Sequence, residues 1–225
     1  KITGDKYDPS FSRTQLVELC KERGCHFAAG IDHGFSHCFA VVTGIKDGHR
    51  AFIIDVQSVP ELELAHKVAL LERLYKEVLK IDPRIWPDTS EPGSNTTIRK
   101  AKFRVQEWTK GKDSVTGGIE IVRGKIDPAF GEPELFFLAD DVGVEMLFSR
   151  MSRYHWMVDA AGRFTNEPDE QISKDELDDE IDAARYFLMN EFKPRGSVLA
   201  GAEAATPKHA ASPEAPPTQQ TYLTH

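Results

Sequence analysis

The chain has 225 residues, of which 40% are hydrophobic and 28% are charged, a balance typical of a folded domain. This length excludes a disulfide-stapled mini-protein, and every apolar run is far shorter than the ~18 residues that span a bilayer. The formal net charge of -8 argues against unspecific nucleic-acid binding through bulk positive charge, although it leaves room for a basic patch beside an acidic site. Three cysteines, an odd and sparse set, favour a reducing compartment.

Composition divides the chain into three parts. We expect an N-terminal linker with a short helix over residues 1–25, a folded domain over 26–192, and a disordered tail over 193–225. The tail is rich in Ala and Pro, and its apolar side chains are too scattered to form a packed stripe. Because the chain begins with Lys1 rather than Met and shows no leader, we expect it to be a fragment or processed product of a longer polypeptide.

The predicted elements begin with a short helix and an antiparallel meander. The helix is predicted over Ser12–Glu22, and the three strands over Phe27–Asp32, Cys38–Thr43 and Ala51–Val56. After Pro60, apolar residues at helical spacing predict an amphipathic helix over Glu61–Lys80. A short strand over Arg84–Asp88 follows.

The second half of the chain predicts helices alternating with strands. The helices are Val115–Arg123 and Val142–Ser152, and the strands are Glu134–Leu138 and Tyr154–Asp159. Ser173 and Glu176 have capping-box spacing and predict a last helix that runs to about Asn190. The fold class is therefore α/β: a mixed sheet, with three antiparallel strands and then parallel strands, flanked by helices.

Acids at three separate places could converge on divalent cations, which take oxygen ligands. Asp32 ends an otherwise apolar strand, and Asp88 lies at the edge of a second strand. Asp178, Asp179 and Asp182 open the last helix, where like charges at these spacings oppose the helix unless a cation relieves them. Each place also has a plainer interpretation: turn or cap residues at the first two, and a solvated helix N-terminus at the third.

As a set, these acids resemble the motifs of a ribonuclease H-like nuclease, and more specifically of the C-terminal nuclease domain of the viral large terminase, the DNA-packaging motor of tailed bacteriophages. The resemblance covers roughly residues 26 to 191 and rests on three motifs. These are Gly30-Ile31-Asp32-His33-Gly34, Trp86-Pro87-Asp88-Thr89-Ser90-Glu91-Pro92 and Asp178-Asp179-Glu180-Ile181-Asp182-Ala183-Ala184-Arg185-Tyr186.

The resemblance implies a ribonuclease H-like fold and an endonuclease that cuts concatemeric double-stranded DNA. It implies that Asp32, Asp88, Asp179 and Asp182 hold two Mg²⁺ or Mn²⁺ ions. Asp178 and Glu91 would be alternative ligands or hydrogen-bond partners of the ligands. At the third motif Leu177 and Asp179 stand where relatives often carry His, so the choice among Asp178, Asp179 and Asp182 stays open.

The resemblance also implies partners. The sequence has no phosphate-binding loop of the form Gly-x-x-x-x-Gly-Lys-Ser/Thr, so an ATPase domain is expected upstream. Portal, small terminase subunit and procapsid are the further partners that the family implies. The expected location is the host-cell cytoplasm, without membrane contact.

A basic segment between the second and third motifs is the expected path for DNA. It holds Arg99, Lys100, Lys102, Arg104, Lys110 and Lys112, with Glu107 as its one acid. Such residues suit phosphate contacts that position a duplex without reading its sequence, although a plain solvated surface has the same composition.

Two other functional interpretations stay open. One is a different ribonuclease H-like enzyme, such as a Holliday-junction resolvase or a transposase, which would prefer branched DNA or defined ends. The other is a non-enzymatic module whose acidic helix binds a basic partner. The Cys and His residues between 20 and 38 lack the spacing of a structural zinc site.

Overall fold

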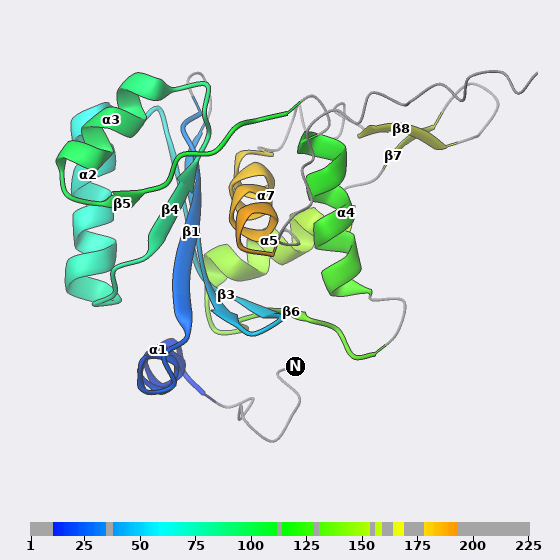
Figure 1. Ribbon diagram of the computed structural model, residues 1–225, viewed down its shortest axis with the longest axis horizontal. Helices are drawn as coiled ribbons and strands as arrows, with labels where there is room; N and C mark the ends of the chain where they lie inside the picture. The colour runs from blue at the N-terminus through cyan, green and yellow to red at the C-terminus, as the bar shows by residue number, and fades with distance from the viewer. Residues whose placement is uncertain are drawn as a thin grey trace, which may run out of the picture.

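The computed structural model describes residues 11–34, 38–111, 114–127, 131–153, 156–158, 164–168 and 178–192. In these ranges a central sheet lies between two layers of helices (Figure 1). The elements are α1 (Arg13–Glu22), β1 (His26–Asp32), β2 (Cys38–Asp47), β3 (Arg50–Pro60), α2 (Leu64–Glu72), η1 (Arg73–Val78), β4 (Arg84–Pro87), α3 (Pro92–Lys100), β5 (Arg104–Val105), α4 (Ser114–Ile126), β6 (Leu135–Phe137), α5 (Val142–Arg153), β7 (Trp156–Val158), β8 (Phe164–Pro168) and α7 (Asp179–Phe192).

The central sheet has six strands in the order β5-β4-β1-β2-β3-β6. Strands β1, β2 and β3 form an antiparallel meander, whereas β4 runs parallel to β1, β5 parallel to β4, and β6 parallel to β3. This arrangement confirms the predicted mixed sheet. Because β1 and β4 are parallel neighbours, their carboxyl ends meet at the same edge of the sheet.

Side chains alternate between the two faces of the sheet and bury each face against different helices. Ala28 and Val42 pack against α7 and α5 on one face, whereas Ile31 and Val41 pack against α2, η1 and α3 on the other. Helix α1 lies on this second face, where its Leu16 packs with core residues of β2 and β3. The predicted N-terminal helix therefore shares a hydrophobic core with the sheet.

Helix α7 approaches β1 unusually closely, because Gly30 has no side chain. A Cβ atom at Gly30 would lie 1.7 Å from the carbonyl oxygen of Ala183 and 2.9 Å from the backbone nitrogen of Phe187. Ala183 and Phe187 are both fully buried at this contact. The glycine thus places the first turn of α7 directly beside the end of β1.

The structure differs from the predicted elements in four places. The helix predicted from Glu61 begins at Leu64, because β3 extends to Pro60 and Glu61 takes a left-handed backbone conformation with φ of 49°. Strands β2 and β3 are longer than predicted, because cross-strand pairing continues beyond their apolar runs. Segment 92–105, for which no helix or strand was predicted and whose second half belongs to the predicted basic stretch, forms α3 and β5. Strand β8 was not predicted either. Residues 173–177 and the predicted tail 193–225 lie outside the described ranges.

Candidate metal centre

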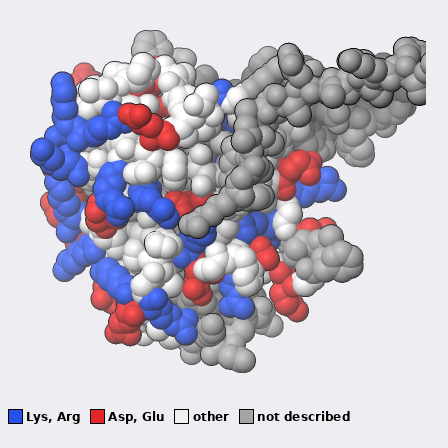
Figure 2. Space-filling model, viewed as in Figure 1, with Lys and Arg blue, Asp and Glu red and all other residues white. Residues whose placement is uncertain are grey.

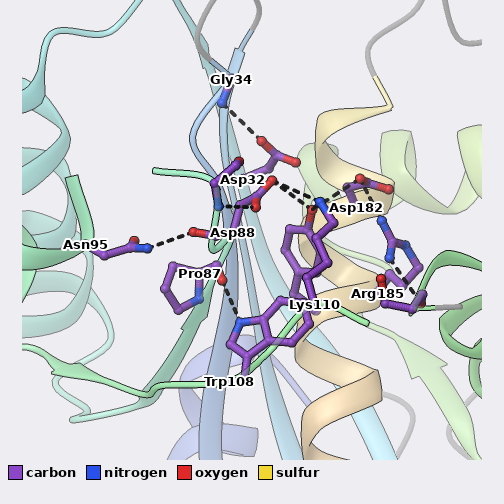
Figure 3. A network of polar contacts seen from close by, with 12 residues as sticks. Asp32, Gly34, Pro87, Asp88, Asn95, Trp108, Lys110, Asp182 and Arg185 are labelled. Atoms are coloured by element: carbon purple, nitrogen blue, oxygen red, sulfur yellow. Dashed lines mark hydrogen bonds and ion pairs between the residues drawn. The ribbon is translucent and has the colours of Figure 1, made fainter. Parts of the chain in front are cut away.

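Strands β1 and β4 bring Asp32 and Asp88 side by side. Ile31 pairs with Pro87 in the parallel register, and the backbone N–H of Asp88 donates to the carbonyl of Ile31 at 2.8 Å. Asp32 is the last residue of β1 and Asp88 directly follows β4, so both acids lie at the edge where the two carboxyl ends meet (Figure 3). The strand pairing joins two acids that lie far apart in the sequence.

Helix α7 brings Asp182 to the same place through Tyr186, one helical turn further on. The Tyr186 hydroxyl donates to Asp88 Oδ2 at 3.0 Å and lies 3.4 Å from Asp182 Oδ2. Asp182 Oδ2 is also 2.7 Å from Arg185 Nη2, and the Arg185 side chain is almost fully buried. Acids from three separate segments, Asp32, Asp88 and Asp182, thus meet at one sheet edge.

Asp179 and Asp178 occupy different positions at the start of α7. Asp179 is buried, and its Oδ2 accepts a hydrogen bond from the backbone N–H of Cys38 at 2.9 Å, which joins α7 to the start of β2. Asp178 precedes the helix, and its carbonyl accepts from the N–H of Asp182 at 2.8 Å. Asp179 and Asp182 raise the pKa of Asp32 by charge repulsion.

The pKa values of the two strand-end acids are shifted in opposite directions, because their neighbouring groups differ. Burial, followed by repulsion from Asp182, Asp88 and Asp179, raises the pKa of Asp32 from 3.8 to about 7, against the opposing N–H of Gly34. Burial also disfavours the charge on Asp88, but the hydrogen bonds from Ser90 and the Lys110 ammonium lower its pKa. One site therefore holds a carboxyl that resists ionisation beside one that is readily ionised.

The donor set fits a hard divalent cation, but the side chains do not enclose one as they stand. Carboxylate oxygens are the ligands that Mg²⁺ and Mn²⁺ prefer, and buried like charges are tolerated best beside a cation. Among the described residues, no three His, Cys, Asp or Glu side chains converge closely enough to hold a metal ion. Asp88 instead contacts Tyr186 and Lys110.

The predicted DNA-binding residues separate into two groups. Lys110 lies at the acids, with its Nζ 3.4 Å from Asp88 Oδ2. The others lie on or after α3: Arg99 pairs with Glu107 at 3.2 Å, Arg104 lies 3.7 Å from Asp82, and Lys100 and Lys102 are exposed. Lys and Arg side chains gather on the side of the molecule where α2 and α3 lie (Figure 2). Lys112 is outside the described residues.

A pocket of about 420 Å³ lies on the α3 side of the end of β4. It lies between α3 and the segment from Val105 to Thr109, and Pro87 and Thr89 on either side of Asp88 contribute to its wall. Arg99 and Trp108 also line the pocket. The pocket therefore reaches from the basic side of the molecule to the end of β4.

Two polar residues that the sequence analysis did not assign hold the strand ends together. His33 Nε2 lies 2.7 Å from Asn95 Oδ1, and Asn95 Nδ2 donates to the carbonyl of Asp88 at 2.7 Å. Both side chains are buried. His33 lies in the first of the three motifs, but no role was predicted for it. Asn95 lies in a helix that no apolar pattern predicted. Tyr186 is the last residue of the third motif, and no role was predicted for it either.

No protein family model and no curated protein matches this sequence. Solved structures do match it. The large terminase (g2p) nuclease domain of bacteriophage SPP1 with bound Mn has a TM-score of 0.57 at 19% identity, over 74% of this chain and 86% of that one. The P22 large terminase nuclease domain has a TM-score of 0.51 at 17% identity, over 76% and 87%.

A longer protein shows the same likeness. The large terminase of a thermophilic bacteriophage, in complex with ADP, has a TM-score of 0.56 at 17% identity, over 78% of this chain but 40% of that one. The chain thus spans less than half the length of that terminase. The resemblance in the motifs is confirmed at the level of architecture: this chain has the ribonuclease H-like fold of phage large terminase nuclease domains.

Proposed function

We propose that this chain is the nuclease domain of a viral large terminase and hydrolyses double-stranded DNA with the help of divalent cations. The observation that carries the proposal is the convergence of Asp32, Asp88 and Asp182, from three separate segments, at one edge of the sheet. The fold that the chain shares with phage terminase nuclease domains supports the same function.

In this proposal the acids hold two Mg²⁺ or Mn²⁺ ions. Asp32, Asp88 and Asp182 are the primary ligands. Asp179 is a further ligand, and Asp178 is an alternative ligand. When bound, such ions activate the attacking water and stabilise the charge on the departing 3′ oxygen. The chain itself supplies the rigid placement: the pairing of β1 with β4 sets two of the carboxylates, and the close packing of α7 on Gly30 sets the third.

The basic residues on the α3 side guide the DNA toward these acids. Arg99, Lys100, Lys102 and Arg104 contact phosphates, and Lys112 stays a predicted contact. Arg99 lines the pocket whose wall also includes Pro87 and Thr89, the chain neighbours of Asp88. Phosphate contacts of this kind carry no sequence information, so we expect cleavage of low sequence specificity.

The wider setting follows from the same assignment. We expect an ATPase domain upstream, contacts with the portal, the small terminase subunit and the procapsid, and cleavage of concatemers in the host cytoplasm at the start and end of packaging. The likeness to the longer terminase of the thermophilic bacteriophage supports the upstream domain. No described helix is long and apolar enough to cross a membrane.

An acidic interaction module is a poorer fit to the geometry. Only 8% of Asp88 and 6% of Asp179 is exposed, so these acids do not present a charged surface to a partner. A resolvase or transposase would share the fold, and its substrate preference separates it from a terminase nuclease.

The test is Mn²⁺-dependent cleavage of plasmid DNA. We expect Asp32→Asn and Asp88→Asn each to abolish cutting while circular dichroism shows an intact fold, because each removes a metal ligand. Asp127→Asn, which changes an exposed acid just after α4, is the matched control. Undiminished cutting by both site variants would overturn the assignment. A strong preference for branched over linear DNA would favour the resolvase interpretation.

A further inference from the structure

Lys110 is held in place at the acids by the segment that carries it. Two residues earlier, Trp108 Nε1 donates to the carbonyl of Pro87 at 2.7 Å, and its ring centroid lies 5.3 Å from that of Tyr186. Lys110 Nζ then lies 3.1 Å from the Tyr186 hydroxyl and 3.4 Å from Asp88 Oδ2. Figure 3 shows the ammonium pointing at the carboxylates.

This contact engages Asp88 at the place where a metal ligand is needed. Asp88 Oδ1 accepts from the N–H of Ser90 at 2.8 Å, and Oδ2 faces both Tyr186 and Lys110. Both oxygens of Asp88 therefore have partners already, in agreement with the finding that no three acidic, His or Cys side chains of the described part enclose a cation. A divalent ion at Asp88 would also be repelled by the ammonium.

A DNA phosphate offers Lys110 an alternative partner. The lysine side chain is about one-third exposed, at 34%, so its head can move to a phosphate without leaving a buried cavity. An ammonium forms charge-assisted hydrogen bonds with phosphate as well as with carboxylate. Transfer of the ammonium would leave the Tyr186 hydroxyl as the remaining partner of Asp88 Oδ2 and would remove a positive charge from the site in the same step.

We propose that Lys110 is an internal competitor of the divalent cation and couples metal loading to DNA binding. Without DNA, its ammonium neutralises Asp88 and weakens metal binding. With DNA, the ammonium moves to a phosphate and Asp88 becomes available. Linkage requires the effect to be mutual, so the metal must also strengthen DNA binding. The inference rests on the proposed function, since it takes Asp88 as a metal ligand.

The expected effects are modest and measurable. Because the Lys110 pair is partly exposed, we expect Lys110→Met to tighten Mn²⁺ binding about fivefold in the absence of DNA. Duplex DNA should tighten Mn²⁺ binding to the original protein by a similar factor and should do so much less in Lys110→Met. Lys110→Arg, which keeps the charge, should resemble the original protein.

The experiment is an Mn²⁺ titration of the full chain, followed by the electron paramagnetic resonance signal of free Mn²⁺, with and without a short phosphorothioate duplex that resists hydrolysis. Lys76→Met is the control for charge alone, because Lys76 is an exposed lysine on η1. Equal thermal unfolding temperatures without metal establish that the variants fold alike.

The outcomes separate this inference from the proposed function. If Asp88→Asn binds Mn²⁺ as tightly as the original protein, the assignment of the metal centre fails. If Asp88→Asn loses affinity but Lys110→Met binds Mn²⁺ unchanged or more weakly, the competitor role of Lys110 is wrong and the metal centre stands. An equal effect of Lys76→Met would also overturn the role of Lys110.

Discussion

Replacing Asp32 by Asn removes a carboxyl group that the folded protein holds in an unfavourable charged state above neutral pH. The pKa of Asp32 is raised from 3.8 to about 7, first by burial and then by repulsion from Asp182, Asp88 and Asp179. Asn keeps the hydrogen-bond acceptor for the Gly34 N–H, which lies 3.1 Å from Asp32 Oδ1, but it carries no charge. The variant should therefore be the more stable protein when metal is absent.

The pH dependence of this stability difference follows from how many protons Asp32 binds in the folded and in the unfolded chain. Below about pH 4 Asp32 is protonated in both the folded and unfolded chain, so the substitution changes little. Between 3.8 and about 7 the unfolded chain releases the proton while the folded protein keeps it, so the stability of the original protein falls as pH rises. Above pH 7 the full penalty is present.

The free-energy penalty for ionising Asp32 in the folded protein has an upper limit. The interval from 3.8 to about 7 corresponds to about 4 kcal/mol, at about 1.4 kcal/mol for each pH unit. Asp32 keeps some contact with solvent, and its acidic neighbours also adjust their protonation, so we expect a measured gain of about 1–3 kcal/mol.

Urea unfolding in EDTA at about pH 5 and about pH 8.5 tests this expectation. The gain should be larger at the higher pH, and Mn²⁺ should reverse the order by stabilising the original protein alone. Asp82→Asn, which removes an exposed carboxylate, should show neither effect. If Asp32→Asn is no more stable than the original protein at the higher pH, the strained acidic cluster does not exist.

Three further substitutions test the framework of the site, each by urea unfolding. Gly30→Ala would place Cβ 1.7 Å from a backbone oxygen of α7 and should cost ~3 kcal/mol or more, whereas Gly93→Ala meets no atom within 4 Å and should be neutral or slightly stabilising. Glu191→Gln weakens the pair between a buried carboxylate and a partly exposed arginine of β4 and should cost ~2 kcal/mol; no loss would show that this pair does not contribute to stability. Leu16→Ala should cost ~2–4 kcal/mol, and a smaller loss would show that α1 is dispensable to the core.

The elements that could be predicted from the sequence are those with a local apolar pattern. Strands β1 to β3 carry continuous apolar runs between turn signals, and α5 repeats its apolar residues at helical spacing. Helix α3 was not predicted, because Ile98 is its only buried hydrophobic side chain and its sequence, with Pro, Gly, Ser and Asn in the first turn, indicates a turn as readily as a helix. Strand β5 has two residues and shows no pattern.

The sequence by itself determined which residues could supply oxygen ligands and in what order they occur, because residue type and strand ends are local properties. Only the tertiary structure decided that Tyr186 joins Asp88 to Asp182, and that Lys110, expected on the path of the DNA, lies among the carboxylates. These contacts depend on the pairing of β1 with β4 and on the close packing of α7 against Gly30. Such long-range contacts leave no pattern in the sequence around either residue. The two partners are far apart in the chain, and only the fold brings them together.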